Sequence, residues 1–252
     1  MLIDSPRLTD YDRSAWGDLE RYDRALAGSA RLERLVTQGV DAIHAWRDAG
    51  DGVASVSWGK DSVVMAHLVA VADPTIPFVW VRSGKWESPE CDDVRDAFLA
   101  RHPDIRYEER IAKIRNPKRG EPGFEAHHLD PLSRSQDTLT EEIPERYISG
   151  VRAEESRTRE KSARVHGMVT ARTCRPLLWW RGVDVFAYLY QEGLPVHPAY
   201  AMSFGGRWDR RWLRVHALCS FHDSRRTVDV PMWEDHYYGD HIAQLLRKDS
   251  PE

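Results

Sequence analysis

A short cluster of small and polar residues in this sequence could hold a phosphate group. The letters SWGKDS fill positions 57–62, between a short apolar run and a stretch whose apolar residues have helical spacing. A strand that turns tightly into a helix directs several backbone N–H groups at one point, and the helix dipole adds positive potential there. Gly59 would let a ligand approach the backbone, and Lys60 would add a compact positive charge. We therefore expect a phosphate-binding turn at this position.

Other side chains of the cluster have more than one interpretation. Ser57 and Ser62 offer hydroxyl donors, whereas Asp61 could either cap the helix or hold a metal ion. The cluster is not a Walker loop, because the pattern GxxxxGK[ST] is absent. An ordinary capped turn without a ligand is the alternative, but six residues of these types in this order favour phosphate binding.

The elements that would position this turn alternate between strands and helices. Short apolar runs predict strands at 53–57, 76–81, 105–111 and 147–151. Helical spacing is found at 11–49, 61–71, 89–101, 154–166, 183–191 and near 236–246. This alternation predicts an α/β fold with a parallel twisted sheet, right-handed crossovers and helices on both faces, as in Rossmann-like proteins.

We expect three segments along the chain. Residues 1–49 form an N-terminal helical segment, residues 50–202 a nucleotide-binding domain, and residues 203–252 a C-terminal extension packed on it. Inside the second segment, residues 112–139 carry several prolines and glycines without a steady period, which predicts a long loop.

Composition limits the class of protein. The chain has 252 residues, of which 41% are hydrophobic and 30% charged, and its formal net charge is −4. These values are ordinary for a soluble globular protein, and a protein that mainly coats nucleic acid would usually be basic. Three cysteines without CxxC spacing argue against a disulfide scaffold, a zinc site and an iron–sulfur cluster. No signal pattern and no run of about 18 apolar residues occurs, so we expect a cytoplasmic protein without a membrane partner.

Several segments together resemble the phosphoadenylyl-sulfate (PAPS) reductase family of the PP-loop N-type ATP pyrophosphatases. SWGKDS is similar to the SGGKDS pyrophosphate loop of these proteins, and VRSGKWE at 81–87 stands where they carry D-T-G. GVRAEESRTR at 150–159 resembles their G-x-R-x-E-[EQ]-S-x-x-R segment. PLLWWRGVDVFAYL at 176–189 and LPVHPAY at 194–200 resemble the segments P-L-x-x-W-x-x-x-D-V-x-x-Y-[IL] and l-P-x-x-P-x-Y.

The resemblance implies an adenine nucleotide alpha hydrolase-like fold, in which the nucleotide lies across the carboxyl ends of the strands. In adenylylating relatives the loop holds ATP with Mg²⁺, and an acceptor attacks the α phosphate so that pyrophosphate leaves. We expect this reaction here with an unidentified acceptor, with Lys60, Asp61 and Arg152 in catalytic roles and Asp61 as a magnesium ligand. The residues expected to bind the adenine nucleotide are Ser55, Ser57, Trp58, Gly59, Lys60, Asp61, Ser62, Ser83, Gly84, Gly150, Arg152, Ser156 and Arg159.

The tail of the chain departs from the reductase pattern. Reductases of this family use a cysteine in an E-C-G-L-H setting, whereas the nearest cysteine here, Cys219, stands in LCSFH, a setting more typical of a buried small residue. We therefore expect an ATP-dependent enzyme and not a typical thiol reductase. One alternative is a sulfonucleotide enzyme, either a PAPS reductase or a relative of the small subunit of sulfate adenylyltransferase. A non-catalytic nucleotide- or nucleic-acid-binding subunit is the other.

Two further features have open interpretations. Trp58 stands where the family loop has a glycine, so its ring could pack internally or stack on the ligand, and a positive φ there would be strained. Residues 205–226 combine six arginines with two histidines and two tryptophans, which suits a nucleic acid or a nucleotide-like acceptor. An amphipathic helix with solvated arginines is the favoured alternative for this stretch. The chain could also form a homodimer.

Overall fold

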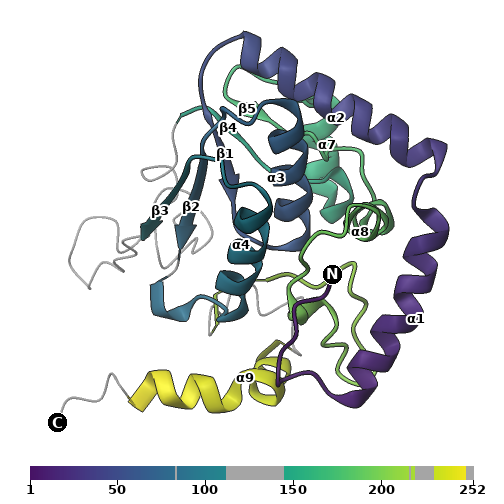
Figure 1. The fold of residues 1–252 in the computed structure, drawn as a ribbon, viewed down its shortest axis with the longest axis vertical. Helices are drawn as coiled ribbons and strands as arrows, with labels where there is room; N and C mark the ends of the chain where they lie inside the picture. The colour runs from purple at the N-terminus through teal and green to yellow at the C-terminus, as the bar shows by residue number, and fades with distance from the viewer. Residues whose placement is uncertain (83, 112–144, 216, 219–229, 248–252) are drawn as a thin grey trace.

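The structure, a computed structural model, describes residues 1–82, 84–111, 145–215, 217–218 and 230–247 (Figure 1). Its helices are α1 (Asp10–Leu26), α2 (Ala30–Asp48), α3 (Lys60–Ala72), α4 (Glu90–Arg101), α7 (Arg157–His166), α8 (Gly182–Gln191) and α9 (Val230–Arg247). Its strands are β1 (Val53–Val56), β2 (Phe78–Arg82), β3 (Tyr107–Ile111), β4 (Tyr147–Ile148) and β5 (Thr173–Cys174). Short 3-10 turns are η1 (Gly84–Trp86), η2 (Ala153–Glu155) and η3 (Pro198–Tyr200). The predicted loop at 112–139 lies outside the described residues.

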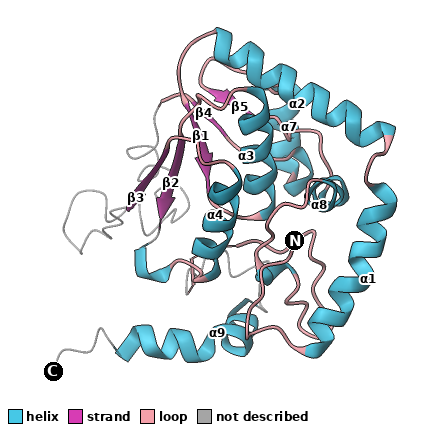
Figure 2. Ribbon diagram, in the orientation of Figure 1, coloured by secondary structure: helices cyan, strands magenta, loops and turns pink. Residues whose placement is uncertain are grey.

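The strands form one parallel sheet in the order β3-β2-β1-β4-β5 (Figure 2). Helices cover both faces of this sheet. Val56 of β1 pairs with Trp80 of β2, and Ala54 pairs with Ile148 of β4. The chain builds outward from β1 to β3 and then returns to the other side of β1, so the strand order reverses there. Open α/β sheets bind ligands at the carboxyl end of such a switch point. The predicted α/β fold class is confirmed.

Capping residues divide the N-terminal helical stretch into two helices. Thr9 and Asp12 form a capping box that starts α1, and the side chain of Ser29 caps the start of α2. Gly28 lies between the two helices with a φ of 66°. The periodic pattern at 11–49 therefore corresponds to two helices, which meet at an angle along one side of the molecule (Figure 1).

The other predicted elements are present with shifted ends. The predicted helix at 154–166 is interrupted at Ser156, whose side chain accepts a 3.2 Å hydrogen bond from the Arg159 N–H and starts α7 after the turn η2. β5 was not predicted, because two residues are too short for a recognisable apolar pattern. The strand predicted at 147–151 is shorter in the structure, where β4 contains two residues.

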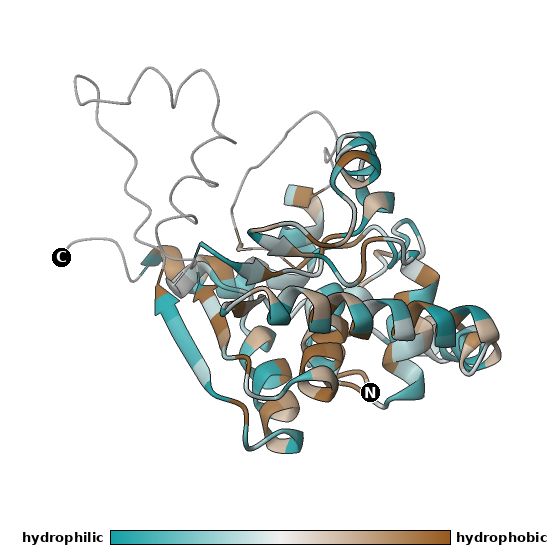
Figure 3. Cartoon of the chain, turned by 90° about the horizontal axis from the view of Figure 1, so that it is seen from above, coloured by the Kyte–Doolittle hydropathy of each residue, from teal (hydrophilic) through white to brown (hydrophobic). Residues whose placement is uncertain are grey.

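Helix α3 is buried around its whole circumference. Its consecutive residues Val63, Val64 and Met65 have no exposed surface, because α2, α8 and β1 all pack against this helix. Figure 3 colours the chain by hydropathy and shows hydrophobic residues concentrated towards the middle of the molecule. The N-terminus of α3, where the SWGKDS turn ends, is thus held in place by packing.

One hydrophobic cluster includes residues from all three segments expected along the chain. Leu32, Trp80 and Tyr238 belong to it, and each is at least 98% buried. The division at positions 49 and 202 stays a proposal. No helix in the described ranges is both long enough and apolar enough to span a bilayer.

Candidate nucleotide-binding site

A pocket of about 310 Å³ lies at the switch point of the sheet, where β1 and β4 end and α3 begins. Eight of the thirteen residues expected to bind a nucleotide line it: Ser55, Ser57, Gly59, Lys60, Asp61, Ser62, Gly150 and Arg159. Six other residues of the described part of the chain also line it: Ser149, Val151, Glu155, Tyr200, Arg214 and Val215. The sheet topology thus brings the SWGKDS turn and the 150–159 motif together around one cavity.

A second cavity, of about 280 Å³, lies between α1 and α8. Trp16, Phe186 and Leu189 form much of its apolar wall, and Glu20 and Asp23 are its acidic residues. It contains no residue of the SWGKDS or 150–159 motifs. The first pocket is therefore the candidate site.

The SWGKDS turn has the compact backbone expected of an anion-binding turn. The Ser57 N–H donates a 2.8 Å hydrogen bond to Ser62 Oγ, which closes the turn. Gly59 is the N-cap residue of α3 and has no side chain to cap the first turn. A Cβ atom at Gly59 would lie 2.9 Å from the Tyr200 hydroxyl, which accepts a 3.0 Å hydrogen bond from the Lys60 N–H. The glycine is therefore required by close packing against Tyr200.

Trp58 adopts a left-handed backbone conformation, with a φ of 58°. Its ring has no exposed surface and contacts Trp80, Phe98 and Tyr107 at centroid distances of 5.5 to 6.4 Å. Of the two interpretations of this ring, the structure shows internal packing, so the expected contact between the Trp58 side chain and the nucleotide is wrong. This packing compensates for a conformation that disfavours a side chain by about 1–2 kcal/mol.

Gly150 allows the 150–159 motif to contact the backbone of the SWGKDS turn directly. A Cβ atom at this position would lie 2.8 Å from the Asp61 carbonyl oxygen and 3.2 Å from the Ser62 nitrogen. No ordinary side chain fits in that space. The end of β4 and the first turn of α3 can therefore approach closely only because residue 150 is glycine.

The ammonium group of Lys60 is bound by protein groups. It donates a 3.0 Å hydrogen bond to the Leu213 carbonyl oxygen, lies 3.2 Å from Asp61 Oδ2 and sits 4.8 Å from the Tyr200 ring centroid. Only 2% of the side chain is exposed. Desolvation by burial lowers the pKa of Lys60, against the opposing effect of the Asp61 carboxylate. Lys60 lines the pocket while its charge is shared with Asp61, so its expected role as a counter-charge for pyrophosphate stays a prediction.

Arg152 is buried behind the pocket and does not line it. Its Nε donates a 2.7 Å hydrogen bond to Asp61 Oδ1, and its Nη1 donates one of 2.7 Å to Glu154 Oε2. The Arg152 side chain is 1% exposed. Arg152 therefore orients Asp61 and is not placed to clamp a phosphate, contrary to the sequence-based expectation.

The residues present do not fit a resident magnesium site. Of the two carboxylate oxygens of Asp61, one accepts from Arg152 and the other lies 3.2 Å from the Lys60 ammonium. A cation would have to displace one of these positive groups. Within the described ranges, no cluster of three histidine, cysteine or acidic side chains has metal-binding geometry.

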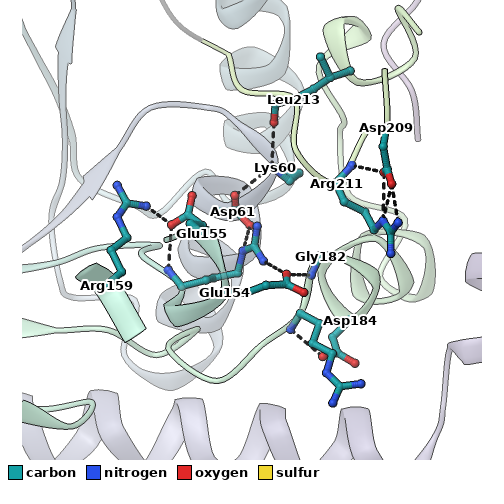
Figure 4. A network of polar contacts seen from close by, with 12 residues as sticks. Lys60, Asp61, Glu154, Glu155, Arg159, Gly182, Asp184, Asp209, Arg211 and Leu213 are labelled. Carbon is teal, nitrogen blue, oxygen red and sulfur yellow. Dashed lines mark hydrogen bonds and ion pairs between the residues drawn. The ribbon is translucent and has the colours of Figure 1, made fainter. Parts of the chain in front are cut away.

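Two arginines line the pocket and share one carboxylate. Arg159 on α7 pairs with Glu155 (Figure 4), and Arg214 Nη2 lies 3.6 Å from the same carboxylate. Glu155 also accepts a 3.1 Å hydrogen bond from the Arg152 N–H. Ser156, predicted as a ligand-binding residue, caps α7 through its side chain and is not in the pocket lining.

The basic stretch at 205–226 is not an amphipathic helix in its described part, which consists of turns. Arg210 is buried, pairs with Asp23 at 2.5 Å and lies over Phe186. Arg211 binds Asp209 through two nitrogens. These two arginines are engaged within the protein, so the favoured helical alternative is wrong and the stretch does not present its full charge to a nucleic acid.

The remaining predicted residues lie elsewhere. Gly84, with a φ of 65°, starts η1 outside the pocket lining, and Ser83 and Cys219 lie outside the described residues. Cys91 and Cys174 are buried, which raises the pKa of both thiols, in Cys174 to about 12. Neither is suited to act as a nucleophile.

Sequence reasoning missed several residues of the pocket. Tyr200 was contained in the LPVHPAY match, which could have identified it. Arg214 and Val215 belong to a stretch considered for contact with a nucleic acid or a nucleotide-like acceptor, and nothing in its pattern indicated that it reaches the SWGKDS turn. Glu155 was part of the 150–159 match without an assigned role.

Comparison with known proteins identifies the family whose members this chain resembles. Residues 52–206 match the model of the phosphoadenosine phosphosulfate reductase domain. The chain is 26% identical over 220 residues to phosphoadenosine 5′-phosphosulfate reductase of Enterobacter sp. (strain 638), covering 81% of this chain and 85% of that protein. It is 24% identical over 184 residues to the Synechococcus sp. enzyme of the same name, covering 68% and 79%.

Among solved structures, the chain is similar to phosphoadenylyl-sulfate (PAPS) reductase from Candida auris, with a TM-score of 0.47 and 11% identity over 76% of this chain and 97% of that one. The curated relatives named above are reductases. Their names contradict our expectation of an ATP-dependent enzyme that is not a typical thiol reductase.

Proposed function

The chain belongs to the phosphoadenosine phosphosulfate reductase domain family, and from this premise we propose that it is a sulfonucleotide reductase that binds an adenine sulfonucleotide of the 3′-phosphoadenylyl sulfate type. The observation that supports this most is the pocket at the N-terminus of α3, which collects eight of the predicted ligand-binding residues. The function named for the curated relatives is consistent with it.

The pocket has the chemistry to hold a polyanion without a metal ion. The first turn of α3 opens into it from a glycine N-cap, and helix N-termini favour anions. Arg159 and Arg214 add two guanidinium groups on its wall. In the reaction a thiolate attacks the sulfur atom of the sulfate group, and adenosine 3′,5′-bisphosphate leaves with the bonding electrons. The helix N-terminus and the arginines would stabilise the negative charge that develops on this leaving group.

The thiol in this proposal is Cys219. Cys91 and Cys174 are buried and their pKa values are raised, so neither supplies a thiolate. Cys219 is the third cysteine of the chain and lies outside the described residues. Its assignment rests on the sequence and on the chemistry of the reaction.

The experiment is calorimetric titration with 3′-phosphoadenylyl sulfate and, separately, with ATP in the presence and absence of Mg²⁺. We expect the sulfonucleotide to bind without metal, and the Arg159→Ala variant to bind it about tenfold or more weakly. Arg164→Ala is the matched control, because Arg164 lies on the same helix, pairs with Glu160 and is 72% exposed. It should bind like the wild type.

A turnover assay distinguishes the proposed reductase from a non-catalytic subunit and from an adenylylating enzyme. With dithiothreitol as reductant, we expect release of sulfite and adenosine 3′,5′-bisphosphate from the sulfonucleotide, and loss of this activity in Cys219→Ser with binding retained. Binding without turnover would support the alternative of a non-catalytic subunit. Mg²⁺-dependent preference for ATP, with release of pyrophosphate, would overturn the proposal in favour of adenylylation.

A further inference from the structure

We propose that Arg214, which comes from the C-terminal segment, is a second substrate-contact residue that binds the anionic part of the nucleotide together with Arg159. Glu155 holds the two guanidinium groups and competes with the ligand for them. This inference rests on the proposed function, because it concerns the same pocket. It adds a residue outside every matched sequence motif and gives Glu155 a role in setting affinity.

The residues on both sides of Arg214 lie against the SWGKDS turn. The Leu213 carbonyl oxygen accepts the 3.0 Å hydrogen bond from the Lys60 ammonium. Val215 lies against the same turn, because a Cβ atom at Gly59 would be 3.9 Å from the Val215 Cβ atom. These contacts place the Cα atom of Arg214 at the rim of the pocket, and they give the buried Lys60 side chain a positioning role.

The side chain of Arg214 lines the pocket from its exposed side. It is 57% exposed, and its 3.6 Å separation from Glu155 is too long for a hydrogen bond. Exposed ion pairs of this kind contribute about 0–1 kcal/mol. A phosphate or sulfate oxygen would make shorter, charge-assisted hydrogen bonds to the same guanidinium, which are about twice as strong as neutral ones.

Glu155 is the fixed partner in this arrangement. It is 11% exposed, and its carboxylate accepts the 3.1 Å hydrogen bond from the Arg152 backbone. Its negative charge lies between Arg159 and Arg214 on the pocket wall, where a ligand anion would also be attracted. Removing this charge while keeping the hydrogen-bond acceptor should therefore strengthen anion binding.

Other arginines of the same stretch do not share this position. Arg210 is buried with Asp23, and Arg211 is bound to Asp209. Of the arginines within the described part of 205–215, Arg214 alone lines the pocket. The contrast between Arg211 and Arg214, three residues apart and both exposed, supplies a matched pair for the test.

The experiment is titration of the full chain with adenosine 3′,5′-bisphosphate and with AMP, in wild type and three variants. We expect Arg214→Ala to weaken binding of the bisphosphate about tenfold, and Arg211→Ala to change it less than twofold. Glu155→Gln keeps an oxygen for the Arg152 N–H and should tighten binding about threefold. Thermal unfolding of each variant checks that the fold is retained.

The outcomes distinguish this inference from the proposed function. If the wild type binds the bisphosphate and Arg214→Ala behaves like Arg211→Ala, the inference is overturned and the proposed function stands. If Glu155→Gln weakens binding, the competition between Glu155 and the ligand is overturned. If the wild type binds neither nucleotide nor 3′-phosphoadenylyl sulfate, both proposals are wrong.

Discussion

Arg152 Nε donates a 2.7 Å hydrogen bond to Asp61 Oδ1, across 91 positions of the sequence. The same guanidinium binds Glu154, whose Oε2 accepts a 2.7 Å hydrogen bond from the Gly182 N–H at the start of α8. One buried side chain therefore joins the SWGKDS turn, the 150–159 motif and the following helix. Sequence motifs that belong to separate elements meet here as a structural unit behind the pocket.

Replacing Arg152 by methionine should strongly destabilise the protein. The substitution keeps an unbranched side chain but leaves Asp61 and Glu154 without their shared cation, and breaking a buried ion pair costs about 3–5 kcal/mol. Urea unfolding followed by tryptophan fluorescence measures the difference in the free energy of unfolding.

Arg164→Ala is the control for this experiment, because its pair with Glu160 is exposed on both sides. It should change the free energy of unfolding by about 0.5 kcal/mol or less. A similarly small effect for Arg152→Met would show that the buried pair does not hold the motifs together.

Adding one methyl group at Gly150 should destabilise the candidate site. The new Cβ would meet the Asp61 carbonyl oxygen at 2.8 Å, and both groups belong to packed backbone. We expect Gly150→Ala to lower the free energy of unfolding by about 1–3 kcal/mol, as overpacking commonly does. Gly17→Ala in α1 is the matched control, since a Cβ there meets nothing within 4 Å. It should be neutral or stabilising by up to about 1 kcal/mol; equal effects at the two positions would refute the close approach.

Trp58 offers a test in which glycine should be better than alanine. Removing the ring from its buried contacts with Trp80 and Phe98 costs about 3–5 kcal/mol in Trp58→Ala. Glycine loses the same contacts but adopts a φ of 58° without strain, so Trp58→Gly should be about 1 kcal/mol more stable than Trp58→Ala. Chemical denaturation of both variants measures this order. The usual order, with alanine more stable, would contradict the left-handed backbone at this residue.

The sequence predicted which residues lie at the pocket where the path of the backbone alone decides their position. Gly59 and Gly150 occur in motifs that follow predicted strands, and parallel topology brings the carboxyl ends of neighbouring strands to one edge. The directions of long side chains could not be predicted in this way. The Lys60 side chain is directed by its hydrogen bond to the Leu213 carbonyl oxygen. Leu213 is 153 positions away, in a segment that has no periodic pattern.

The interpretation of Trp58 stayed open, and Arg152 was misassigned, for a related reason. A tryptophan at a loop position is compatible with stacking on a ligand or with packing, and only the positions of Trp80 and Phe98 on other elements decide between them. The charge of Arg152 matched that of a phosphate clamp, but two acidic residues already surround it in the fold. Partners distant in sequence therefore determine what a motif residue does.

Two buried histidines should make the protein less stable in mild acid. His197 is fully buried, with Nδ1 accepting the Ala199 N–H at 3.1 Å and Nε2 lying 3.1 Å from Ser88 Oγ. His67 Nδ1 lies 2.9 Å from the Tyr188 hydroxyl. Desolvation by burial lowers the pKa of each imidazole from 6.5 to about 4, and for His197 the nearby Glu90 opposes the effect.

Between pH 6.5 and about 4 the unfolded chain therefore binds protons at these histidines that the folded chain does not. The free energy of unfolding should fall with decreasing pH in this window, by about 1.4 kcal/mol per pH unit for each histidine. Urea unfolding at several pH values measures the slope, and His67→Gln should reduce it by one histidine's share because glutamine does not titrate. An unchanged slope in that variant would mean that the folded protein accepts the proton at His67, and that burial does not hold this imidazole neutral.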